Sequence, residues 1–212
     1  KFKDTPGVHM YQAPATSLSL ILNPAPAPEG QLNPFSIKEV RFALNYIINR
    51  EFVAQEIYKG MAVPMFAHVG PFDYDYLSVY PLVKEYNVSY QPELANRIIE
   101  EAMTEAGAVL KDDYWYYKGE RIQLKFIIRV EDERREIGDL IRAELDKMGF
   151  FVIPIYHQFA PAIYTVYSSD PQLFQWHLYT EGWGSGAPER YDFGRINQMY
   201  APWLGNMPGW QE

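Results

Sequence analysis

The chain has 212 residues, of which 48% are hydrophobic and 22% are charged, a composition that excludes a disordered protein. Its formal net charge is −8 and no dense basic run occurs, so nucleic acid is not expected as a partner. The chain has no cysteine, which excludes disulfides, thiolate zinc sites and cysteine nucleophiles, and no apolar run approaches the roughly 18 residues of a membrane helix.

The first expected element is a strand within residues 5–22. Leu18, Leu20 and Leu22 alternate at its end and should point to one side of a sheet. Residues 24–34 are rich in Pro and Gly, which is typical of a linker, but we interpret them as a surface loop within one domain.

Residues 34–64 carry the clearest pattern in the chain and predict one long helix. Ser36 and Glu39 have the spacing of a capping box at its start, and Gly60 provides a left-handed stop. The apolar positions recur every three or four residues and should form one buried face. These positions are Val40, Ala43, Leu44, Ile47, Ala54 and Ile57.

The middle of the chain alternates between helices and strands. Residues 65–91 lack periodicity and predict an irregular, packed surface segment, after which Pro92 opens a helix that Gly107 ends. Residues 120–130 predict a strand with one protected face, residues 131–148 a helix, and residues 150–155 a strand parallel to the first. A short helix over residues 158–168 and a strand over residues 173–180 complete an α/β fold with a mixed sheet flanked by helices.

The segment from Glu181 to Asp192 is the best candidate for a ligand site, and we expect it to form a loop after the last strand. Its glycines allow backbone amides to approach a ligand, Trp183 offers a flat face, and ligands commonly bind at the carboxyl ends of strands. A tight surface turn with a packed indole is the alternative. The candidate ligand contacts are Glu181, Gly182, Trp183, Gly184 and Ser185.

Other chemistry is weakly supported by the sequence. Glu181 and Asp192 could pair as glycosidase carboxylates, but nearby carboxylates are common in any acidic chain. His157 and His177 stand on expected strands and could face each other, although two histidines without a third ligand are more often structural. We therefore expect no catalytic residues, no metal site and no cofactor.

Four segments of the sequence resemble the family 5 solute-binding proteins of ABC importers, the oligopeptide- and dipeptide-binding group. The chain matches the patterns of that family at an N-terminal turn and strand, along the expected long helix, in the next helix and in the glycine-rich segment. The matching residues are Thr5, Pro6, Gly7, Leu22, Asn23, Val40, Arg41, Ala43, Leu44, Ile48, Arg50, Glu51, Gly60, Ala62, Pro64, Tyr90, Pro92, Glu93, Ala95, Ile99, Glu105, Ala106, Gly107, Gly182 and Trp183.

The resemblance implies that residues 1–212 form a single periplasmic-binding-protein-like lobe, the second ligand-binding lobe of a larger two-lobe protein. Such a protein is not an enzyme. It would bind oligopeptides between its lobes outside the cytoplasm and deliver them to the permease subunits of an ABC importer.

The resemblance also implies that Trp183 lies against the ligand. The acidic residue that pairs with a peptide amino group in some relatives falls on Gly186 here, so that contact cannot be carried over. Glu181, Glu189 or Asp192 could replace it. An oligosaccharide ligand, stacked on aromatic rings, is the alternative within the same role, and a glycan-acting hydrolase is the alternative of another class.

Overall fold

A mixed sheet of four strands in the order β1-β7-β5-β6 forms the centre of the structure, a computed structural model that describes residues 5–9, 16–67, 69–73, 75–86 and 88–184. Strand β1 (Thr16–Leu22) at one edge pairs antiparallel with β7 (Leu178–Gly184). Strand β5 (Gln123–Arg129) lies parallel to β7 and to β6 (Phe151–His157). The predicted α/β fold with a mixed sheet is confirmed.

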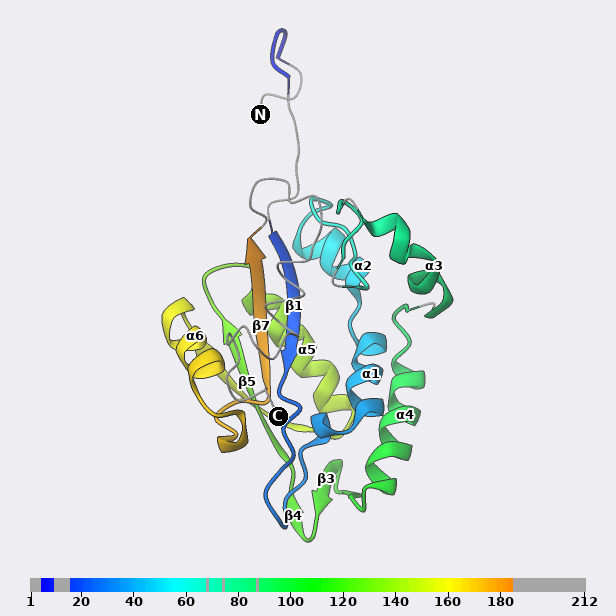
Figure 1. Cartoon of the computed structure of the whole chain (residues 1–212), viewed down its shortest axis with the longest axis vertical. Helices are drawn as coiled ribbons and strands as arrows, with labels where there is room; N and C mark the ends of the chain where they lie inside the picture. Colours follow the sequence, from blue (N-terminus) through cyan, green and yellow to red (C-terminus); the bar gives the residue numbers. More distant parts are fainter. Residues whose placement is uncertain (1–4, 10–15, 68, 74, 87, 185–212) are drawn as a thin grey trace.

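Helices cover both faces of this sheet (Figure 1). On one face lie α1 (Lys38–Ile47), α4 (Pro92–Glu105) and α5 (Arg134–Lys147), and on the other lies α6 (Phe159–Ser168). Helix α5 connects the parallel strands β5 and β6, as the strand, helix, strand pattern predicts. Both α4 and α6 form where the sequence places them.

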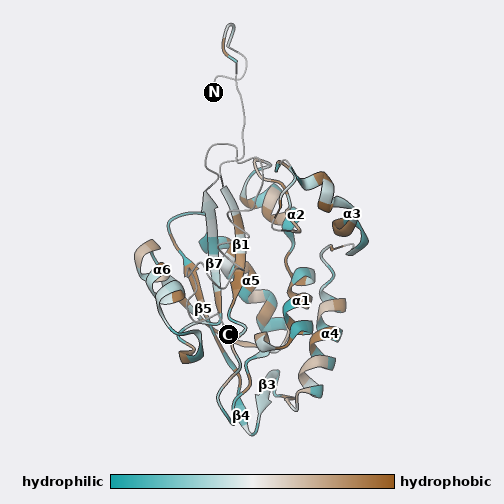
Figure 2. Ribbon diagram, viewed as in Figure 1, coloured by the Kyte–Doolittle hydropathy of each residue, from teal (hydrophilic) through white to brown (hydrophobic). Residues whose placement is uncertain are grey.

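The side chains of β5 divide between two apolar cores. Leu124, Phe126 and Ile128 join the larger core beneath α1, α4 and α5. Ile127 points the other way, into a smaller core with Trp176 and residues of α6. The expectation of one protected face is therefore wrong, because β5 is an inner strand with helices above and below it. Much of β5 is coloured as hydrophobic in Figure 2.

A smaller antiparallel sheet packs at the base of the larger core. It contains β2 (Val109–Lys111), β3 (Tyr114–Tyr117) and β4 (Glu120–Arg121). Trp115 of β3 is 2% exposed, and its indole Nε1 donates a 2.9 Å hydrogen bond to the carbonyl oxygen of Met148. This bond fixes the small sheet against the end of α5.

The predicted long helix over residues 34–64 is broken. A 3-10 turn η1 (Pro34–Ser36) precedes α1, which ends at Ile47, and a short α2 (Arg50–Phe52) leads into a π-helical turn η2 (Val53–Ile57). Ile48 has an extended backbone, and the side chain of Asn49 accepts a 3.0 Å bond from the backbone N–H of Phe52. An Asn side chain that bonds to a nearby backbone N–H replaces a bond of a continuous helix, so Asn49 ends the first helix and caps a new one.

The predicted capping box is also absent. Ile37, which has no capping side chain, precedes α1, and the hydroxyl of Ser36 donates back to the carbonyl of Asn33. The predicted stop is present, since Gly60 has φ +76° and its N–H donates to the carbonyl of Ala54. The predicted apolar face is buried at every position: Val40, Ala43, Leu44, Ile47, Ala54 and Ile57.

Two further expectations fail. Helix α3 (Tyr76–Tyr86) occupies the segment predicted to be irregular, and it contains Pro81 and buries none of its described residues, so no amphipathic pattern marks it. The last strand begins later than expected, because a 3-10 turn η3 (Pro171–Leu173) and a left-handed Phe174 come first. Strand β7 then runs on to Gly184, so Glu181–Gly184 is strand and not loop.

Candidate functional site

The candidate ligand residues lie at the carboxyl end of β7, where it pairs with the start of β1. Glu181 is opposite Ser19 and Trp183 is opposite Ser17. Side chains alternate along a strand, so Glu181 and Trp183 share the face covered by α6, while Gly182 belongs to the face covered by α5. The structure therefore brings together an indole, a carboxylate and two serines of β1.

Trp183 is held in place by its neighbours. Its indole Nε1 donates a 3.2 Å hydrogen bond to Oγ of Ser19, and its ring packs against the smaller core. The side chain is half-buried, so part of it stays accessible. A fixed and partly accessible indole is suited to stacking on a ligand, because little conformational freedom is lost on binding.

Glu181 is enclosed. It is 4% exposed, its Oε2 accepts a hydrogen bond from the hydroxyl of Tyr167, and its Oε1 accepts from the N–H of Gly182 at 2.7 Å. Burial, together with this carboxylate, raises the pKa of Tyr167 and raises the pKa of Tyr179 to about 12. Both tyrosines therefore remain neutral donors, and the carboxylate is occupied within the protein.

Arg129 at the end of β5 extends this network. Its guanidinium donates to the hydroxyl of Tyr179 at 3.2 Å and to Glu131 at 2.8 Å, and it lies 4.8 Å from the ring centre of Phe159. The hydrogen bond from Arg129 is the main reason that the pKa of Glu131 is lowered. The network connects the ends of β5 and β7 with the start of α6, a link that no sequence motif indicated.

Gly182 provides space on the other face of β7. A Cβ at this position would lie 2.7 Å from a terminal nitrogen of Arg134 and 3.1 Å from Leu18. Arg134 is held there by two hydrogen bonds to Asp132, one of them 2.7 Å long. Gly184, by contrast, faces open space. Gly182 thus allows close packing of a guanidinium, a role that differs from the expected approach to a ligand.

The two strand histidines do not face each other. His177 lies beside Lys125, whose backbone N–H donates to its Nδ1 at 3.1 Å, while His157 pairs with Arg129 four residues further along β5. Burial, with the charge of Lys125, lowers the pKa of His177 to about 4. His177 is therefore a buried, neutral acceptor.

Some candidates cannot be placed. Ser185, Gly186, Glu189, Asp192 and His68 lie outside the described residues. Within the described ranges, no group of His, Asp and Glu side chains could hold a metal ion. None of the helices in the described part of the chain combines the length and apolar character needed to cross a membrane.

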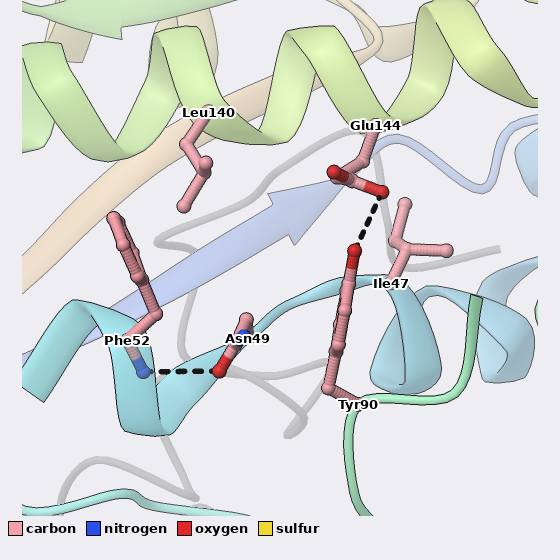
Figure 3. Close-up of a pocket in the computed structure, with 6 residues that line it drawn as sticks. All are labelled: Ile47, Asn49, Phe52, Tyr90, Leu140 and Glu144. Atoms are coloured by element: carbon pink, nitrogen blue, oxygen red, sulfur yellow. Dashed lines mark hydrogen bonds between the residues drawn. The ribbon is translucent and has the colours of Figure 1, made fainter.

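A hollow of about 200 Å³ lies away from these residues, on the face of the sheet that α5 covers (Figure 3). Its lining comes from α1, the break before α2, α2 itself, the segment before α4, and α5. The lining residues are Ile47, Asn49, Phe52, Tyr90, Leu140 and Glu144. The sequence did not indicate this hollow, because the break at Asn49 that shapes the hollow was expected to be helix.

Comparison with known proteins gives matches over nearly the entire chain. The model of the family described as bacterial extracellular solute-binding proteins, family 5 Middle, matches residues 1–198. None of the curated protein sequences matches this chain.

Solved structures with the same fold have diverse ligands. A periplasmic oligopeptide-binding protein from Thermotoga maritima, described as mannohexaose bound, is 21% identical with a TM-score of 0.73, over 95% of this chain and 37% of that one. NikZ from Campylobacter jejuni, in complex with Ni(L-His), is 16% identical with a TM-score of 0.62, over 97% and 38%. The oligopeptide-binding protein AppA from Bacillus subtilis, in complex with a nonapeptide, is 17% identical with a TM-score of 0.56, over 84% and 35%.

These structures share the fold of the chain but not one ligand class. The chain spans between 35% and 38% of the length of the three. The predicted periplasmic-binding-protein-like fold and the predicted family resemblance are both confirmed.

Proposed function

Because the chain belongs to the family 5 bacterial extracellular solute-binding proteins, we propose that it is the second ligand-binding lobe of the substrate-binding component of an ABC importer. The protein would bind oligopeptides in a cleft between this lobe and another. The observation that carries the proposal is the position of Trp183, fixed by Ser19 at the carboxyl end of β7.

The cleft contacts follow from this arrangement. The accessible part of Trp183 stacks on the ligand, and Gly184 follows it at the end of β7. Ser185 remains a candidate contact from the sequence alone. Gly182 and Glu181 contribute indirectly: Gly182 makes room for Arg134, and Glu181 fixes β7 against Tyr167. The enclosed carboxylate of Glu181 does not replace the acidic residue that is missing at Gly186, so a peptide amino group would need another partner.

The proposed mechanism is reversible binding of the ligand, with no covalent step. In the full-length protein the two lobes close around the ligand and exclude water, and the permease subunits recognise the closed form outside the cytoplasm. This lobe alone offers part of the contact area and cannot close, so it should bind ligands weakly. The family is one of solute-binding proteins and not of enzymes, and the enclosure of Glu181 disfavours a role as a glycosidase carboxylate.

An oligosaccharide is the second candidate ligand. The candidate site has Ser17 and Ser19 of β1 beside the indole, and Glu181, the one carboxylate of this site among the described residues, is enclosed. Sugars stack on indole faces and form hydrogen bonds with neutral groups. The similar protein from Thermotoga maritima is described as mannohexaose bound. These features suit a neutral ligand.

A ligand screen of the full-length protein tests the proposal. Bound ligand stabilises the folded state, so peptide and oligosaccharide pools are scored by the rise in melting temperature. Trp183→Ala should abolish the rise, whereas Tyr164→Ala, which removes an exposed ring on α6, should leave it intact. A peptide hit supports the leading proposal, and a hit only with oligosaccharides supports the second. Equal binding by Trp183→Ala and the parent would refute the proposed site.

A further inference from the structure

The hollow beside α5 has two aromatic walls. Figure 3 shows the rings of Phe52 and Tyr90 edge-on at opposite sides of the hollow, with Leu140 and Glu144 reaching in from α5. The break at Ile48 and Asn49 creates this geometry, since it starts a new helix and places Phe52 across from Tyr90. The result is a slot with flat sides and a carboxylate at one edge.

The walls of the slot are accessible from outside. Phe52 is 44% exposed and Tyr90 is 40% exposed. A planar group placed between them would remove apolar area from water on both of its faces, and a cation there would also be attracted by the negative faces of the rings.

The carboxylate at the edge is well placed to receive a cation. Glu144 is 6% exposed; its Oε2 accepts a 3.2 Å bond from the hydroxyl of Tyr90 and its Oε1 a 2.8 Å bond from Lys147. Each carboxylate oxygen has a second lone pair that these bonds leave unused.

The charge around the slot also favours a cation. Burial is the main reason that the pKa of Tyr90 is raised; the charges of Glu144 and Glu93 raise it further, and that of Lys147 lowers it. Two carboxylates thus act on Tyr90, one wall of the slot, against one ammonium. Lys147 is mostly exposed, with 64% of its side chain accessible, so solvent weakens its effect.

We propose that this slot binds a guanidinium group, stacked between Phe52 and Tyr90 and hydrogen-bonded to Glu144. The flat shape of guanidinium fits between two rings, and its fork of N–H donors suits a carboxylate, whereas an ammonium matches neither feature. The hollow of about 200 Å³ is smaller than the roughly 300–1,000 Å³ of ordinary small-molecule sites. It therefore suits a group the size of a side chain, either a small free guanidinium compound or an arginine side chain of a peptide.

This site is separate from the proposed cleft. Trp183 lies on the face of the sheet covered by α6, and the slot lies between helices on the opposite face. The inference does not depend on which solute the cleft binds, and it adds a second binding site to the lobe.

Titrations followed by the NMR signals of the Phe52 and Tyr90 rings test the proposal. The probes are methylguanidine, as the free group, and N-acetyl-argininamide, as the side chain borne by a peptide unit. Saturable shifts are expected with dissociation constants of about 1 mM, a plausible strength for so small a ligand. Binding of both probes indicates that the free group suffices, and binding of the argininamide alone indicates a peptide source; either supports the site.

Matched controls separate the site from general binding. N-acetyl-citrullinamide has nearly the same shape without the charge, and it should bind at least about tenfold more weakly. Phe52→Ala and Glu144→Gln should weaken the argininamide about tenfold, while Phe72→Ala, which removes a ring that is 64% exposed elsewhere, should change nothing. If Glu144→Gln fails to fold, Phe52→Leu tests the same slot. Equal binding of the citrulline compound, or no ring shifts with either probe at about 20 mM, would overturn the proposal.

Discussion

Protonation of His177 should destabilise the folded chain in mild acid. His177 is 8% exposed and its Nδ1 accepts a hydrogen bond from the backbone of Lys125, so a proton on Nδ1 would remove the acceptor and bury a charge. The pKa of His177 is lowered from 6.5 to about 4. At about 1.4 kcal/mol per pH unit, this difference corresponds to about 3 kcal/mol of unfolding free energy.

The direction follows from the proton count. Between pH 6.5 and about 4 the unfolded chain binds a proton that the folded chain does not, so stability rises with pH across this window. The stability linked to neutral His177 is fully present above pH 6.5 and is lost as the pH falls toward 4.

Urea unfolding at a series of pH values measures this effect. His177→Asn keeps an acceptor oxygen but cannot titrate, so its loss of stability across the window should be smaller by about 3 kcal/mol than in the parent. Leu173→Ala, which removes a side chain that is 63% exposed and carries no titratable group, is the control and should keep the slope of the parent. Parallel pH curves for His177→Asn and the parent would show that the burial of His177 does not govern acid stability.

Three further predictions concern the packing of the chain. Gly149→Ala should lower the free energy of unfolding by about 2–4 kcal/mol, because Gly149 has φ +84° and a Cβ would lie 2.8 Å from Leu110. The control Gly119→Ala, at φ +88° in open space, should lower it by only about 1 kcal/mol in the same urea assay. Tyr167→Phe should cost about 1–3 kcal/mol, since buried Glu181 loses a donor, and stability equal to the parent would contradict the role of this bond. Asn23→Ala should cost about 3 kcal/mol in melting experiments, because the buried carbonyls of residues 171 and 176 lose their donor.

The fold was predictable where the pattern of side chains reflects burial on one helix face. The apolar positions from Val40 to Ile57 are buried as expected, and α4 starts at Pro92, because proline suits the first turn of a helix. The break between Ile47 and Arg50 was missed, since the apolar spacing continues across it, and only the capping side chain of Asn49 interrupts the helix.

Only the outline of the candidate site could be read from the sequence. The glycine-rich pattern named Trp183 and its neighbours as candidate ligand contacts after a strand, and in the structure Glu181, Gly182, Trp183 and Gly184 form the carboxyl end of β7. It could not predict that Glu181 is enclosed, because the groups that enclose it come from other elements: Tyr167 from α6, and Arg129 from β5 through Tyr179. Such contacts depend on tertiary packing, which local patterns do not encode.

The extension of β7 has a consequence for how a ligand could be recognised. A loop after Thr180 would leave Glu181 free to turn toward a ligand, whereas pairing of β7 with β1 as far as Gly184 fixes the direction of each side chain. Trp183 then shares a face with Glu181, and the carboxylate is occupied by Tyr167 and by the N–H of Gly182. In the described part of this candidate site the chain therefore presents a flat ring and hydroxyl groups but no free charge. This arrangement favours recognition of ligand shape and hydrogen bonding over recognition of a charged terminus.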